Sequence, residues 1–311
     1  MLPVSHVTAG DVLRLAELDQ LRRTSSLRGA GLVAHAWATI FAGMAVYVVW
    51  PSALTLVVAV AVIGSRQLGL FVLMHDASHW LLFRHHRLNN GVVKWLCAYP
   101  LGEDLPAYRR THHLHHRHTQ QPDDPDLALA APFPVTRARF WGDALRDLSG
   151  FSACAMVISA RPWRKPAVAW RRLRGPVLSN AVLLGLLAGA GHWYLYPLLW
   201  LLPLATWYRL VTRLRTVAEH AMVPDNDDPL LNSRTTATGP LGRAFLAPYW
   251  VNYHLGHHLL VFVPCWKLRR AHALLLAKGY GTRMERSPGY LDVIRQATRP
   301  SLRPPYPAGS I

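Results

Sequence analysis

Two long apolar segments near the start of the chain constrain its fold more than any other feature. The first covers residues 31–50 and holds 20 residues without an Asp, Glu, Lys or Arg. After a tight turn at Pro51 and Ser52, the second covers residues 53–74. About 20 consecutive apolar residues are needed to cross the hydrocarbon core of a bilayer. Each segment therefore predicts a membrane-spanning helix.

Two further apolar segments, residues 176–191 and 193–210, predict a second pair of spans. The stretch before them, residues 76–174, is too polar to cross a membrane. We therefore expect an all-α protein, a bundle of about four transmembrane helices with a helical cap. Arg66 interrupts the second span, and a charge at that depth is costly unless it is satisfied. It either faces the interior of the bundle or extends to an interface.

Composition and charge distribution agree with a membrane protein. Charged residues make up only 16% of the chain, against about 25% in soluble domains. The net charge of +17 comes from 34 Lys and Arg against 17 Asp and Glu, and it is concentrated next to the apolar spans. Such a distribution follows the positive-inside rule and argues against nucleic-acid binding. The rule places both termini in the cytoplasm.

The ends of the chain add less information. Thr8 and Asp11 have the spacing of a capping box, and the stripe that follows predicts a helix over about residues 11–23. This helix lies either on the membrane surface or against the rest of the domain. Nothing here resembles a signal peptide. We expect one domain over residues 1–298 and a disordered, proline-rich tail over residues 299–311.

Clustered histidines are the chemical anomaly of the chain, which contains 17 of them. Three clusters follow predicted spans: one has two histidines four residues apart, and two share the spacing i, i+3, i+4. The clusters are His75 and His79; His112, His115 and His116; and His254, His257 and His258. Residues at these spacings share a helix face, with Cβ atoms about 6 Å apart. Their imidazoles can therefore converge on a metal.

Eight or nine histidines are too many for one metal ion. A structural zinc site takes four ligands, usually including cysteine, but Cys97, Cys154 and Cys265 have no metal-ligand spacing. Divided over two metals, the histidines supply four or five nitrogens each. Imidazole suits iron, copper, nickel and zinc alike.

Two assignments among the histidines stay open on sequence alone. In the second cluster, His113 and His118 are alternatives, although residues five apart do not share a helix face. His220 follows the last predicted span and is a single further candidate.

At these residues the chain resembles the membrane fatty acid desaturase family, which carries an HxxxH box, an HxxHH box and an [HQ]xxHH box. The resemblance covers about residues 31–275 and extends to Arg110, Thr119 and the run 124–126 around the second box. The flank 252–254 and the pair 263–264 look like a bacterial branch of the family.

The resemblance implies a four-span bundle in the bacterial inner membrane, with two iron ions held on the cytoplasmic side. It implies dioxygen as co-substrate and His220 as a further ligand. It also suggests that Asp76 and Asn252 orient the imidazoles. The chain has no haem-binding module, no Rossmann fingerprint and no cysteine-rich iron–sulfur motif. The electrons are therefore expected from a separate donor protein, such as a ferredoxin.

The expected chemistry is oxidation of an unactivated C–H bond. Removing hydrogen from two neighbouring carbons of a long fatty acyl chain makes it a desaturase. Inserting oxygen makes it a hydroxylase or ketolase of a lipid or carotenoid. A metal-binding or metal-transporting membrane protein is a third possibility, but its spans would need polar ligands, and Arg66 and His35 are nearly the only candidates.

Overall fold

The computed structural model describes residues 8–160 and 166–299, and this part of the chain is mainly helical. Of the tail expected to be disordered, residues 299–311, all but Arg299 lie outside the described residues. The principal elements in chain order are α1 (Ala9–Val12), α2 (Leu15–Arg22), α3 (Ser26–Val49), α4 (Ala53–Ser78), α5 (His86–Val93), α6 (Leu105–Arg117), α7 (Leu127–Ala130), α8 (Arg137–Leu148), α9 (Phe151–Ala160), α10 (Pro166–Gly189), α11 (Leu202–Ala205), α12 (Trp207–His220), β1 (Thr235–Thr236), α13 (Pro240–Phe245), α14 (His254–Leu259), α15 (Leu268–Ala277), β2 (Arg286–Ser287) and α16 (Tyr290–Ala297).

Helices α3 and α4 form the hairpin that the sequence predicts for residues 31–50 and 53–74. Ser52 begins α4 by accepting a hydrogen bond from the Thr55 amide at 3.2 Å, which satisfies one of the free N–H groups at a helix start. Within the described residues, these two helices are long and apolar enough to cross a membrane. Much of α3 is exposed, whereas most of α4 is buried inside the molecule. Helix α4 is therefore the central helix of the fold.

Two glycines let other segments approach α4 closely. A Cβ atom at Gly64 would lie 2.9 Å from Trp207 of α12, and one at Gly69 would lie 2.9 Å from the ring of Tyr249. Because real Cβ atoms do not sit so near another heavy atom, a larger residue would push these segments away. Helix α12 therefore packs closely against α4, the helix that carries His75.

The second predicted pair of spans differs in detail from the expectation. Helix α10 begins at Pro166, ten residues before the predicted start, and ends at Gly189. The segment 193–210 is not one helix, because the chain forms a π-helical turn over Tyr196–Leu201 and then α11, and breaks at Thr206 before α12. Pro197 and Pro203 lack the N–H that a regular helix needs, which explains the irregular hydrogen bonding.

The N-terminal helix is divided and packs on the domain. The capping box forms, with the Thr8 amide 2.8 Å from Asp11, but Leu13 is extended and separates α1 from α2. Glu17 of α2 pairs with Lys278 at 2.7 Å, and Leu18 is buried. The sequence left open whether this segment lies on the membrane surface or against the rest of the domain. The structure shows it packed against the domain. The predicted continuous helix over residues 11–23 is wrong because Leu13 interrupts it.

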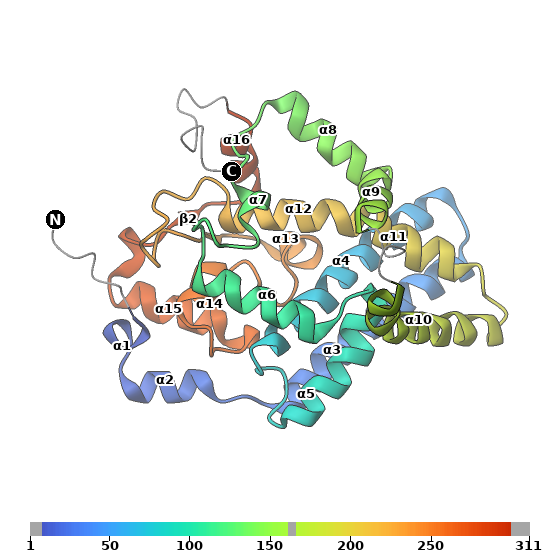
Figure 1. Cartoon of the computed structure of the whole chain (residues 1–311), viewed down its shortest axis with the longest axis horizontal. Helices are drawn as coiled ribbons and strands as arrows, with labels where there is room; N and C mark the ends of the chain where they lie inside the picture. The colour runs from blue at the N-terminus through green and yellow to red at the C-terminus, as the bar shows by residue number, and fades with distance from the viewer. Residues whose placement is uncertain (1–7, 161–165, 300–311) are drawn as a thin grey trace.

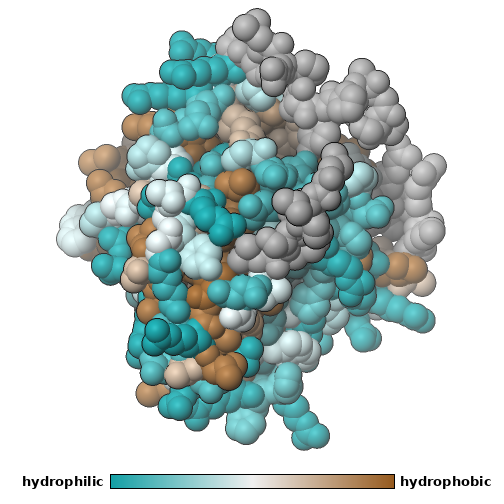
Figure 2. All heavy atoms as spheres, turned by 90° about the vertical axis from the view of Figure 1, so that its left-hand side faces the viewer, coloured by the Kyte–Doolittle hydropathy of each residue, from teal (hydrophilic) through white to brown (hydrophobic). Residues whose placement is uncertain are grey.

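The molecule is elongated, with α10 and α11 toward one end of its long axis and α1, α2 and α15 toward the other (Figure 1). The end formed by α1, α2 and α15 is largely hydrophilic (Figure 2). The short parallel strands β1 and β2 join the segment after α12 to the segment before α16. Cys97 and Cys265 are buried, Cys154 is exposed, and all three are free thiols.

Candidate metal centre

Four helices bring the predicted ligands together from distant parts of the chain. The C-terminal end of α4 supplies His75, and His79 caps that helix. Helix α6 carries the second cluster and α14 the third. His220 is the last residue of α12, the helix packed behind α4. All nine histidines proposed as ligands, including His220, lie in two adjacent groups.

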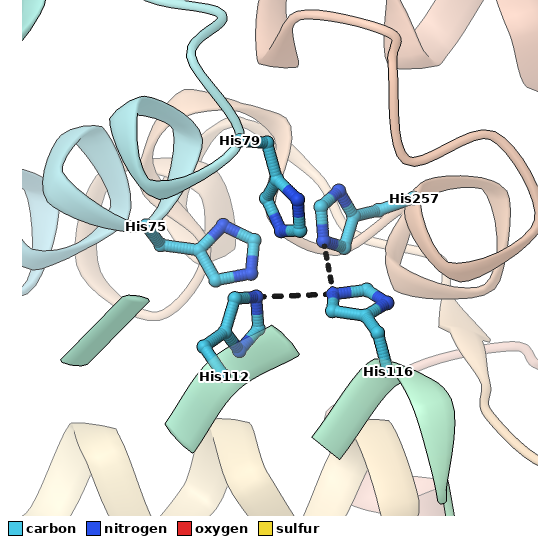
Figure 3. Close-up of side chains that lie close together, drawn as sticks. All are labelled: His75, His79, His112, His116 and His257. Atoms are coloured by element: carbon cyan, nitrogen blue, oxygen red, sulfur yellow. Dashed lines mark hydrogen bonds between the residues drawn. The ribbon is translucent and has the colours of Figure 1, made fainter. Parts of the chain in front are cut away.

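The first group holds five imidazoles that converge from three directions (Figure 3). Its members are His75, His79, His112, His116 and His257. The Nε2 atom of His116 lies 3.0 Å from that of His112 and 3.0 Å from that of His257. One candidate ligand atom from each of the five lies within 4.8 Å of all the others. This is a compact cage of nitrogen donors.

The second group holds four imidazoles: His115, His220, His254 and His258. The Nε2 atoms of His220 and His254 lie 2.8 Å apart, and those of His254 and His258 lie 3.0 Å apart. His115 closes the group, with its Nε2 atom 3.3 Å from that of His258. The i, i+3, i+4 spacing on α6 and α14 divides each cluster between the two groups.

The spacing of these nitrogens suits metal ions. Metal–imidazole bonds are about 2.0–2.1 Å long, so two nitrogens at a right angle on one ion lie about 3 Å apart. The Nε2 atoms of His75 and His79 are buried and have no hydrogen-bond partner among the described residues. A buried polar atom without a partner is costly unless something binds it. The donor set therefore fits two metal ions, one in each group.

Lowered histidine pKa values in both groups also favour metal binding. Burial, with a contribution from nearby cationic and imidazole groups, lowers the pKa of His79 to about 3. Burial likewise lowers the pKa of His257 and His258 well below the usual value for histidine. These three imidazoles are therefore neutral at physiological pH, and a neutral imidazole has the free lone pair that a metal requires.

Two buried carboxylates contact the second group. Asp124 accepts a hydrogen bond from Nδ1 of His115 at 2.9 Å. Glu219 lies 3.5 Å from Nδ1 of His254 and pairs with Arg215 at 2.7 Å. Burial raises the pKa of Glu219 to about 7, against the opposing effect of Arg215. Such outer partners fix the orientation of a ligating imidazole.

The sequence assigned this orienting role to other residues. Asp76 instead accepts a hydrogen bond from the Cys265 amide at 3.1 Å, and the Asn252 amide donates to the Thr236 carbonyl at 3.1 Å. Both therefore secure backbone segments beside the site. In the sequence, Glu219 directly precedes His220 and Asp124 follows the second histidine cluster. Their contacts with imidazoles depend on the tertiary arrangement and could not be inferred from these positions.

The alternative histidines of the second cluster lie outside both groups. His113 contacts the Ser78 carbonyl at 3.1 Å through Nε2, and His118 caps the end of α6. His85 is exposed at the start of α5. These positions agree with the preferred division of the cluster.

A small cavity of about 150 Å³ adjoins the histidines. His115, His220 and His254 of the second group line it, as does His112 of the first. Its apolar wall is formed by Phe71, Tyr108 and Leu129. The rest of the lining is polar: Gln120, Asp126 and, from α12, Thr212, Arg215, Thr216 and Glu219. A cavity of this size holds about one benzene molecule, or six carbons.

Comparison with known proteins agrees with this architecture. The sequence model of the fatty acid desaturase family matches residues 48–288, and the chain belongs to this family of membrane-associated oxidoreductases. The dihydrorhizobitoxine desaturase of Bradyrhizobium elkanii is 27% identical over 262 residues, covering 76% of this chain and 69% of that protein. The beta-carotene ketolase of Paracoccus sp. (strain PC1) is 26% identical over 206 residues, covering 65% of this chain and 73% of that protein.

Proposed function

We propose that this protein is an oxygen-dependent desaturase of a long fatty acyl chain, with an iron ion in each histidine group. The observation that carries the proposal is the convergence of nine histidines in two adjacent groups, in a chain of the desaturase family. Bound iron would supply the oxidation of an unactivated C–H bond by dioxygen. Its ligands would be the five histidines of the first group and the four of the second.

The protein's own residues would position the substrate and limit the access of water. Phe71, Tyr108 and Leu129 offer an apolar surface beside the histidines, against which about six carbons of an acyl chain can pack. The rest of a long chain would extend out of the cavity. Forming a double bond removes two hydrogens from neighbouring carbons and, with dioxygen, two electrons and two protons, yields two molecules of water.

Ketolation or hydroxylation of a lipid or carotenoid is the second candidate. It is favoured by the similarity to a carotene ketolase, which equals the similarity to a desaturase in percentage identity to within one point. Mass spectrometry of lipid extracts from cells with and without the expressed protein separates the candidates. Loss of two hydrogens identifies desaturation, gain of one oxygen identifies hydroxylation, and gain of oxygen with loss of two hydrogens identifies ketolation. An unchanged lipid and carotenoid profile would contradict both.

The proposed placement is the bacterial inner membrane, with both histidine groups and both termini in the cytoplasm. The charge asymmetry around the apolar segments supports this orientation. A reporter fused after Ile311 tests this orientation. A signal confined to the periplasm would place the C-terminus outside the cytoplasm and contradict the proposed topology. Electrons would come from a separate ferredoxin-like protein.

A further inference from the structure

A second cavity, of about 550 Å³, lies between α3, α4 and α13, away from the histidine groups. None of the nine grouped histidines lines it. Its wall has an apolar part, formed by side chains such as Leu32, Val62 and Phe245, and a polar part. The polar part includes His35, Arg66, Arg243 and Tyr249. The lining contains two arginines and no carboxylate.

Arg66 is the unusual member of this lining. It sits midway along α4, a helix apolar enough to cross a membrane, and is only 7% exposed. Its guanidinium donates to the Ala244 carbonyl and lies 5.6 Å from the ring of Tyr249. Within the described residues Arg66 takes part in no ion pair. A guanidinium has five N–H donors, more than the Ala244 carbonyl and the Tyr249 side chain can accept, so it can also bind an anion.

The surroundings of Arg66 form a shaped site. The Tyr249 hydroxyl donates to the Leu32 carbonyl at 3.2 Å and lies 3.0 Å from Nδ1 of His35, which fixes the ring as one wall. Tyr249 and Trp250 both have positive φ, at 53° and 61°, a conformation that costs free energy in residues other than glycine. Such strain is retained where the surrounding structure requires it. Arg243 is exposed at the rim and adds a second positive charge.

The position of the cavity along α4 limits what can occupy it. Arg66 precedes His75 by nine residues, which is about 13 Å at 1.5 Å per residue. Arg66 contacts Ala244 of α13, which follows the last predicted span, and the α3 residues of the lining lie in the N-terminal part of that helix. Both segments are on the side proposed to be cytoplasmic, so the cavity lies toward the cytoplasmic end of α3 and α4, near the lipid headgroups. Basic pockets between membrane helices on the cytoplasmic side are suited to anionic headgroups.

We infer that this cavity binds the headgroup phosphate of an anionic phospholipid, with Arg66 and Arg243 as its charge partners. The upper part of an acyl chain packs against Leu32, Val62 and Phe245. None of the grouped histidines lines this cavity, and the occupant assigned to it is a resident lipid. Bound lipid neutralises a buried charge that the described protein residues leave unpaired.

Native mass spectrometry of the detergent-solubilised full chain tests this inference. The protein is exposed to an equimolar mixture of phosphatidylglycerol and phosphatidylcholine, and the lipid retained per chain is measured. We expect about one retained phosphatidylglycerol, in preference to the zwitterionic lipid. Arg66→Gln should weaken this retention about tenfold, as expected for loss of a charge-assisted hydrogen-bonding partner. Arg243→Gln, at the exposed rim, should weaken it about threefold.

A matched control is Arg269→Gln, which removes the same charge from an exposed position on α15. It should retain lipid like the unaltered protein. Iron content reports folding of each variant without depending on lipid, and Arg243→Gln carries the test if Arg66→Gln does not fold. Unchanged retention in a folded Arg243→Gln variant, or equal losses in the control, overturns the inference. Replacement of bound phosphatidylglycerol by added oleate, with the same arginine dependence, also overturns it and marks a carboxylate site.

Discussion

The two histidine groups differ in how they are supported. The first has five imidazoles, and none of the histidine–carboxylate contacts among the described residues involves it. The second has four imidazoles, contacts with Asp124 and Glu219, and three members on the cavity wall. The first group is thus held by the number of its donors and by burial, whereas the second depends on outer carboxylates. Changes around the cavity should affect the second group selectively.

Removal of one imidazole from either group should have the largest effect. We expect two irons per chain in purified, iron-loaded protein. His257→Ala in the first group and His115→Ala in the second should each lower activity by more than about a hundredfold, because loss of a ligand exceeds the effect of losing an outer partner. Elemental analysis should show reduced iron in both variants.

The control for this experiment is His85→Ala, which changes an exposed histidine that belongs to neither group. It should keep full activity and metal content. A metal content of one or none in the unaltered protein would contradict the proposal of two occupied groups. It would also remove the basis of the comparison.

Replacement of the outer carboxylates should have the next largest effect and should separate the groups. Asp124→Asn and Glu219→Gln each replace a carboxyl group beside an imidazole of the second group with an amide. Loss of such partners costs about 10- to 100-fold in metal affinity or activity. We expect titration with a chelator to release one iron early and one late in both variants. Asp123→Asn, an exposed neighbour without this contact, should behave like the unaltered protein.

The difference between histidine spacing and outer carboxylate contacts also separates what the sequence can predict from what it cannot. The convergence of the histidines could be predicted because helical spacing alone aligns His112 with His115 and His116, and because the apolar hairpin is visible in the composition. The roles of Asp124 and Glu219 were not, since Asp124 turns back onto α6 and Glu219 meets His254 only after α12 packs behind α4. The break at Thr206 also depends on local backbone geometry that an apolar pattern does not encode.

A substitution in the wall of the cavity beside the histidines should lower kcat/KM for the substrate. It should leave the iron content of both histidine groups unchanged. Thr212 lines the cavity, and Thr212→Leu would reduce its volume of about 150 Å³. Misfits of one or a few methyl groups cost about 10- to 200-fold in kcat/KM, and we expect about tenfold here. Iron content should not change. Thr111→Leu, on an exposed position of α6, is the matched control. Equal activity of the Thr212 variant would exclude the cavity as the substrate site.

The smallest expected effect concerns the rate at which the electron donor associates with the protein. It should not differ between the two histidine groups. A ferredoxin-like donor is acidic, and the basic segment before the third predicted span could steer its approach. Arg171, Arg172 and Arg174 are exposed on α10, whereas Arg161, Arg164 and Lys165 of the same segment lie outside the described residues. Replacing Arg171 and Arg172 with Gln should slow donor-dependent turnover about two- to threefold at low ionic strength.

Salt dependence distinguishes steering from a role in topology or lipid contact alone. The Debye length falls to about 8 Å at physiological ionic strength, so a steered association slows as salt increases. Turnover measured at a fixed, subsaturating donor concentration should therefore decrease between low and physiological salt. The Arg171 and Arg172 variant should show a shallower decrease, since part of the attracting charge is gone. A flat profile in the unaltered protein, or full activity with a basic donor, would leave these arginines with a topological role and retain only the need for an external reductant.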